Sequence, residues 1–232
     1  MHPLDNMIWQ ALTTRQTNFA EGSGSARRFQ QDVTLLSGFE APDDAGYADL
    51  AAVVGEGGTA AVFLDQPYEP REGWDWIAGA PLVQMVSMNA AAADGNSSSK
   101  EELVELGLAD SPEMIELTTL TKPGPFGPRT HELGVYLGIR NEGRLAAMAG
   151  ERLKVSGFTE LSAVCTHPDF LGCGYAGLLM AEIMRRIRDR GETPMLHVRA
   201  DNARAIALYE RLGFRIRKEG HFAVLRRSAL KP

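Results

Sequence analysis

The chain has 232 residues, of which 44% are hydrophobic and 23% charged, and its formal net charge is −6 at pH 7. This length suits one large domain or two small ones, and the acidic balance argues against a dedicated nucleic-acid-binding protein. The sequence has no apolar run of about 18 residues and no basic-then-apolar leader, so we expect neither a membrane span nor a signal peptide.

The first half of the chain predicts regular structure without a recognisable chemical motif. Apolar periodicity and helix-start signals predict helices over 6–20 and 43–54, and short apolar runs predict strands over 59–64 and 81–88. The small, polar run over 90–100 predicts a long loop. We place a domain boundary there, which divides the chain into residues 1–100 and 101–232.

The second half gives sharper signals, and together they predict an α/β fold with a mixed, mostly antiparallel sheet flanked by helices. Ser111 followed by Pro112 is typical of a helix start, and the proline-rich segment over 122–128 predicts a stiff loop. The predicted helices cover 111–120, 174–190 and 202–212, and the predicted strands cover 135–140, 144–153, 158–166, 193–200, 214–218 and 221–227.

A glycine-rich segment follows the third strand of this half and opens a helix. Such a loop points several backbone N–H groups at one spot, with the positive end of a helix dipole behind them, and therefore predicts a phosphate or pyrophosphate site. Residues 172–177 also match G-x-G-x-x-G, which leaves a nicotinamide-dependent oxidoreductase as one reading. Two features argue against this reading. Pro168 lies between the preceding strand and the glycines, and three antiparallel strands precede the loop.

In these motifs the sequence resembles the GCN5-related N-acetyltransferase (GNAT) superfamily. Gly174 and Ala176 match the small positions of its pyrophosphate motif Arg/Gln-x-x-Gly-x-Gly/Ala, whereas Leu171 departs from Arg or Gln. The segments 164–168 and 202–214 also fit, in the expected order. Within the superfamily the chain is similar to the FR47-like branch, related to glycine N-acyltransferases, which suggests a GNAT fold over 101–232 and a degenerate GNAT-like copy over 1–100.

The resemblance implies acetyl-CoA, or another short acyl-CoA, as the donor. Main-chain N–H groups of the glycine loop would hold its diphosphate, the preceding strand would pair with its pantetheine arm, and Asn202 would bond to that arm while capping a helix. The implied coenzyme-binding residues are Val164, Cys165, Thr166, Leu171, Gly172, Cys173, Gly174, Tyr175, Ala176, Gly177 and Asn202.

The same resemblance implies that Tyr209 is the general acid that protonates the departing thiolate. A phenol with a pKa near 10 suits this task, although core packing is the alternative role for this side chain. Glu160 is our candidate general base, acting directly or through a water molecule. Glu132 and His131 are the next candidates, and His167 is more typical of a turn residue.

The acceptor is expected to lie against the proline-rich loop and a closing hairpin around residues 219–221. Phe126, Arg129 and Glu132 are the candidate acceptor-binding residues, because an aromatic body and an arginine fork can recognise an apolar group beside a carboxylate. This pattern suggests a free amino acid or another small carboxylated amine as the acceptor.

Other clusters point to simpler roles. Cys165, His167 and Cys173 do not have zinc-ligand spacing, so we expect no metal, and two free thiols suit a cytoplasmic protein. Arginines over 185–190 are typical of a solvated face, or could meet the coenzyme phosphate or a second subunit of a homodimer. The leading hypothesis is direct acetyl transfer to a primary amine of a small molecule, and the alternative is a non-catalytic acyl-CoA-binding regulatory module.

Overall fold

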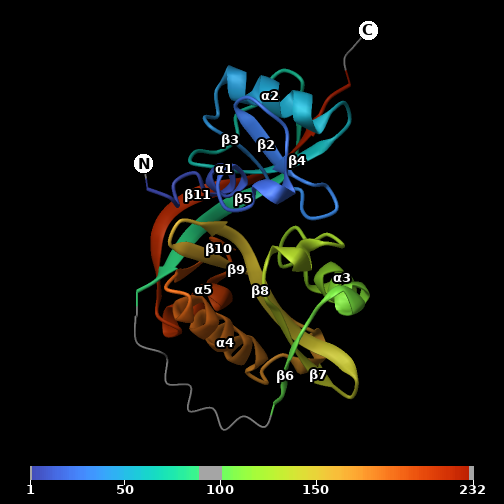
Figure 1. Cartoon of the computed structure of the whole chain (residues 1–232), viewed down its shortest axis with the longest axis vertical. Coiled ribbons are helices and arrows are strands. Elements are labelled where there is room, and N and C mark those ends of the chain that lie inside the picture. The colour runs from blue at the N-terminus through green and yellow to red at the C-terminus, as the bar shows by residue number, and fades with distance from the viewer. Residues whose placement is uncertain (1, 89–100, 230–232) are drawn as a thin grey trace.

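A computed structural model describes residues 2–88 and 101–229 and contains one large sheet and one small one (Figure 1). The small sheet consists of β1 (Ala20–Glu21), β2 (Ala26–Phe29) and β3 (Ser37–Phe39). The large sheet has eight strands, which lie side by side in the order β4 (Thr59–Leu64), β11 (Phe214–Arg227), β5 (Trp74–Ser87), β10 (Thr193–Arg199), β9 (Phe158–Thr166), β8 (Arg144–Val155), β7 (Tyr136–Asn141) and β6 (Leu103–Glu105).

Helices cover both faces of the large sheet, which confirms the predicted α/β class. On one face, α4 (Tyr175–Asp189) and α5 (Ala203–Arg211) pack in a core that includes Leu196 of β10. On the other face, α1 (Met7–Thr13) shares a core with Met195, the neighbouring residue of the same strand, and side chains alternate along a strand. None of the described helices has the length and apolarity needed to cross a membrane.

Two further helices complete the layers, and their ends follow from local chemistry. In α2 (Asp44–Val54) the Asp43 carboxylate accepts a hydrogen bond from the Gly46 N–H at 2.8 Å, as expected of an N-cap. In α3 (Ser111–Thr121) Pro112 occupies the first turn, where its missing N–H has no helical partner. Helix α3 packs on β8 and β9, where Met114 and Leu117 meet Met148 and Cys165 in one core.

The first hundred residues supply two strands of the large sheet. Strand β5 lies between β10 and β11 and pairs antiparallel with both, and β4 pairs with the outer side of β11. In Figure 1, β5 and β11 form a long ribbon that reaches from α5 toward α2. The expected loop over 90–100 lies outside the described residues, and the division at residue 100 stays a prediction.

Several predicted elements differ from the structure. The expected closing hairpin at 219–221 is wrong, because β11 runs continuously from Phe214 to Arg227 along the full length of β5, with Gly220 opposite Leu82. Pairing with β5 fixes this segment in an extended conformation that its own sequence does not dictate. The first helix ends at Thr13 instead of residue 20, and the short strands β1, β2, β3 and β6 were not expected.

Candidate active site

The site begins where strands β9 and β10 separate. Among the described strands these two are the only neighbours that run parallel. Strands β9 and β10 pair only over Phe158–Glu160 and Thr193–Met195. Beyond this point β10 continues to pair with β5 as far as Arg199, whereas residues 161–166 of β9 face no strand on that side. Backbone groups along an unpaired strand edge are free to bond to a ligand that lies parallel to it.

A β-bulge marks the same part of β9. Opposite β8, the register steps from Gly150↔Ser162 to Met148↔Cys165, so two residues of β9 lie across from one residue of β8. Ala163 in this bulge has φ of 52°, a left-handed conformation that is uncommon for a residue with a side chain. Bulges of this kind often re-aim backbone and side chains next to active sites.

A cavity of about 480 Å³ fills the gap between the two strands. It brings together five residues that the sequence predicted for the site: Val164, Cys165, Thr166, Asn202 and Tyr209. The rest of its wall comes from the loop after α3, from β5, β10 and β11, and from the first half of the chain through β4, and includes Phe63, Ala78, Leu82, Lys122, Pro123, Gly124, Arg152, Ser162, His197 and Phe222.

The glycine-rich loop presents free main-chain amides near the start of α4. The N–H groups of Gly172, Gly174 and residues 175–177 make no hydrogen bond to another described residue. Gly172 and Gly174 have φ of 89° and 81°, a left-handed conformation that other residues adopt only at a cost. Leu171, in the place of the expected Arg or Gln, is 53% exposed and adds no charge.

Tyr209 and Asn202 meet at the cavity from the two ends of α5. Tyr209 lines the cavity, is 8% exposed and packs edge-on to Phe214, and its hydroxyl makes no hydrogen bond to any described residue. Burial raises the pKa of Tyr209 to about 12, so the phenol keeps its proton at neutral pH. The Asn202 side-chain oxygen accepts from the Ala205 N–H at 3.1 Å, which confirms its capping role and leaves its amide group for other partners.

Glu160, the candidate general base, is not among the residues of the cavity wall. The side chain is fully buried, and its carboxylate accepts two hydrogen bonds of 2.9 Å from Arg152 and one of 2.8 Å from Nδ1 of His197. Burial alone would raise the pKa of Glu160, but the charge of Arg152 and these bonds lower it to about 2. Such a weakly basic carboxylate holds Arg152 and His197 in place.

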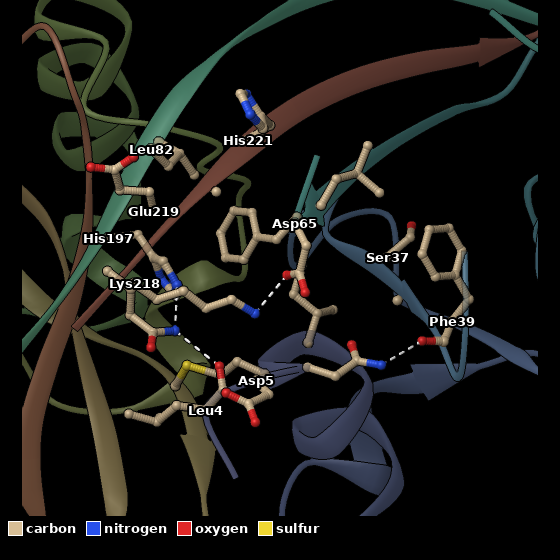
Figure 2. A pocket seen from close by; sticks show the side chains of 18 residues that line it. Leu4, Asp5, Ser37, Phe39, Asp65, Leu82, His197, Lys218, Glu219 and His221 are labelled. Atoms are coloured by element: carbon tan, nitrogen blue, oxygen red, sulfur yellow. Dashed lines mark hydrogen bonds and ion pairs between the residues drawn. The ribbon is translucent and has the colours of Figure 1, made fainter. Parts of the chain in front are cut away.

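His197 links the cavity to a small hollow on the far side of β10. Figure 2 shows this hollow, where Gln84 donates to the Leu4 carbonyl oxygen at 3.0 Å and lies 3.1 Å from Nε2 of His197. The Gln84 oxygen accepts from Arg217, so its amide nitrogen faces the imidazole. The ring therefore donates from Nδ1 to Glu160 and accepts at Nε2, which commits both nitrogens in the neutral form.

Comparison with known proteins identifies the family. Residues 136–223 match the FR47-like protein family. A crystal structure from Novosphingobium aromaticivorans, assigned to the GNAT family of acetyltransferases, shares 36% identity with this chain, with a TM-score of 0.88 over 99% of this chain and 100% of that one. This chain therefore belongs to the GNAT family.

Other comparisons agree on the fold. A GCN5-related N-acetyltransferase from Kribbella flavida shares the GNAT fold with a TM-score of 0.62 at 17% identity, over 96% of this chain and 95% of that one. No curated protein sequence matches the chain. Membership of the GNAT family, to which acetyltransferases belong, supports acyl transfer as the reaction of the cavity and argues against the nicotinamide reading.

The structure does not bring the expected acceptor-binding residues of this GNAT chain to the cavity. Arg129 forms ion pairs with Glu132 at 2.7 Å and with Asp32 at 3.2 Å, so its fork holds the loop against the first half of the chain. Phe126 packs edge-on against Tyr136 in the core beneath α3. The part of the proline-rich loop that does line the cavity runs from Thr121 to Pro125.

Sequence reasoning missed several polar residues of the cavity wall, among them Lys122, Arg152 and His197. The signal for Arg152 was present, because the predicted strands over 144–153 and 158–166 form a hairpin that places residue 152 close to residue 160. His197 sits on β10, where strand alternation alone left the choice of face open. Lys122 falls in the segment over 122–128, whose prolines predict a stiff loop and no more.

The remaining clusters have structural partners. Among the described residues no group of three His, Cys, Asp or Glu side chains could hold a metal ion. Cys165 is buried, and burial raises the pKa of its thiol to about 11, which disfavours a thiolate nucleophile. The arginines of α4 bond within the chain: Arg185 and Arg186 to Glu182, Arg188 to Ser87, and Arg190 to Glu151.

Proposed function

We propose that this protein is an N-acetyltransferase that moves the acetyl group of acetyl-CoA to a primary amine of a small molecule. The observation that carries the proposal is the cavity between the separated strands β9 and β10, with Tyr209 among its lining residues. The transfer is direct, within a complex of protein, donor and acceptor, because the thiol of Cys165 stays protonated and buried.

The free backbone groups fit the donor. Acetyl-CoA would supply the activated acyl group as a thioester. The N–H groups of Gly172, Gly174 and residues 175–177 are unbonded donors at a helix N-terminus, which suits a diphosphate. The unpaired edge of β9 over 161–166 would bond to the amide-bearing arm, and the free amide group of Asn202 lies at the same cavity.

Tyr209 supplies the proton that the reaction returns to sulfur. Nucleophilic attack forms a C–N bond and breaks the C–S bond, and the departing thiolate takes a proton from the phenol. A backbone N–H of the β9 edge would stabilise negative charge on the carbonyl oxygen. None of the residues in the described wall is acidic, and both nitrogens of His197 are committed, so the acceptor would attack as the free amine. The proton that its nitrogen loses after the C–N bond forms would return through solvent to the Tyr209 phenolate.

An acceptor panel tests this proposal. The protein with acetyl-CoA should release free thiol in the presence of at least one small primary amine, and mass spectrometry should find the acetyl group on the amine nitrogen. If acetyl-CoA raises the melting temperature while no amine in a broad panel releases thiol, a non-catalytic acyl-CoA-binding role replaces the proposal. Activity restricted to protein lysines would also contradict it.

A further inference from the structure

The charged residues of the cavity wall all have the same sign. Lys122, Arg152 and Arg199 line it, and no aspartate or glutamate is among its described lining residues. Arg199 is neutralised by Asp201 at 2.6 Å. Lys122 and Arg152 therefore set the electrostatic character of the part of the cavity beneath the proline-rich loop.

Arg152 is buried, yet one of its amino groups has no partner. Arg152 is 6% exposed. Its Nε and Nη2 atoms donate to Glu160, whereas its Nη1 atom makes no hydrogen bond to a described residue. Nη1 lies close to Gly124, which lines the cavity: a Cβ atom added to Gly124 would be 3.9 Å from Nη1. Nη1 itself is not among the fully buried polar atoms, so this N–H pair is open to an acceptor atom of a ligand in the cavity.

Lys122 approaches the same region from the end of α3. It occupies the helix C-cap in a left-handed conformation with φ of 51°, which directs the chain into the loop Pro123–Pro125. Among the described residues it has no ion-pair partner. Around these two cations the wall is apolar, with Phe63, Ala78, Ala80, Leu82 and Phe222 supplied by β4, β5 and β11.

We infer that the acceptor is an amine that carries a carboxylate beside an apolar body, with the carboxylate bound by Nη1 of Arg152 and by the Lys122 ammonium. This inference rests on the proposed function for the identity of the bound molecule as acceptor. The carboxylate occupies the end of the cavity beneath the loop, the apolar body packs against Phe63, Leu82 and Phe222, and the amine extends toward β9 and Tyr209.

A matched pair of acceptors tests the inference in the wild-type protein. Leucine and 3-methylbutylamine differ only by the carboxylate, so the ratio of their kcat/KM values with acetyl-CoA reports recognition of that group. We expect leucine to be preferred by about tenfold or more, since a hydrogen bond between charged groups contributes that much. A ratio at or below one overturns the inference.

Two variants connect the preference to the named residues. Lys122→Met removes an exposed charge, whereas the double variant R152M/E160Q removes both partners of the buried ion pair, so that no charge is left buried alone. Each should lower the leucine to 3-methylbutylamine ratio by about ten- to a hundredfold. Lys218→Met, which removes a lysine paired with Asp65 outside the cavity, should leave the ratio as in wild type. A ratio unchanged in both cavity variants overturns the inference.

A binding measurement separates this inference from the proposed function. Titration calorimetry with N-acetylleucine and with N-(3-methylbutyl)acetamide, in the presence of CoA, requires no turnover. Tighter binding of N-acetylleucine that is lost in Lys122→Met supports the carboxylate site even if no amine releases thiol, in which case only the proposed function fails. Equal binding of the two compounds to wild type overturns the site.

Discussion

At the scale of single residues, Tyr209 and Glu160 illustrate how similar sequence signals lead to different roles. Both carry a proton-exchanging group and both come from motifs of the GNAT resemblance. Tyr209 meets the cavity because the helix α5 begins at Asn202 and its pattern of apolar residues turns the phenol inward. The Glu160 carboxylate instead forms an ion pair with Arg152 on the neighbouring strand, and Glu160 does not line the cavity. A sequence motif identifies a candidate residue, but the side chain that this residue contacts on the next strand determines its chemical role.

Tyr209→Phe should lower kcat about 10²- to 10⁴-fold, the usual contribution of a general acid, while the dissociation constant of acetyl-CoA changes little. Because burial raises the pKa of the phenol to about 12, loss of this proton should not limit the wild-type rate below that pH. Thiol-release kinetics and calorimetry measure the two quantities. Equal turnover in the variant would remove Tyr209 from the chemistry.

Glu160→Gln should destabilise the fold by about 3–5 kcal/mol, because it leaves the buried charge of Arg152 uncompensated. The double variant R152M/E160Q should recover most of this loss. Urea unfolding at neutral pH gives both values. A large fall in kcat with wild-type stability would instead return Glu160 to the role of general base.

The ion pair also predicts a pH dependence. Against the effect of burial, Arg152 and His197 lower the pKa of Glu160 from 4.5 to about 2. A lowered carboxyl pKa stabilises the folded state fully above the unfolded value, and this contribution is lost as the pH falls from about 4.5 toward 2. In wild type the free energy of unfolding should fall over this range more steeply than in R152M/E160Q. Parallel curves would contradict the assignment.

At the scale of elements, the start of α4 makes the clearest prediction. Ala176→Pro removes one free N–H in the first helical turn, where proline is tolerated, and should weaken acetyl-CoA binding by about tenfold or more. Ala176→Ser keeps the N–H and should bind as wild type does. Calorimetry measures both, and far-ultraviolet circular dichroism checks the helix. Unchanged affinity in the proline variant would place the diphosphate elsewhere.

Elements with local signals could be predicted from the sequence, and elements defined by distant partners could not. Asp43, Ser111 and Asn202 mark helix starts through their own side chains or neighbouring proline, and these helices are confirmed. The true extent of β5 from Trp74 and the continuity of β11 depend on their mutual pairing, across more than a hundred residues of sequence. The part of the cavity wall that these strands form therefore could not be predicted from sequence patterns.

At the scale of the whole molecule, the two halves of the chain share one sheet. Strand β5 separates β10 from β11, so the segment 101–232 alone would leave a gap between two of its own strands. We expect this fragment, produced separately, to be unfolded or aggregated, and to gain structure only when mixed with residues 1–100. Circular dichroism and size-exclusion chromatography test this. A stable, monomeric fragment that binds acetyl-CoA would support the division of the chain at residue 100.

The position of β5 also governs the order of events on the ribosome. Its partners β10 and β11 begin at Thr193 and Phe214, each more than a hundred residues after the end of β5 at Ser87. The early strand must therefore wait, with both hydrogen-bonding edges unpaired, until these two later strands have been synthesised. The cavity, whose wall includes residues of β5, β10 and β11, can therefore form only after the last of these strands, and contacts between segments so far apart in sequence favour slow folding.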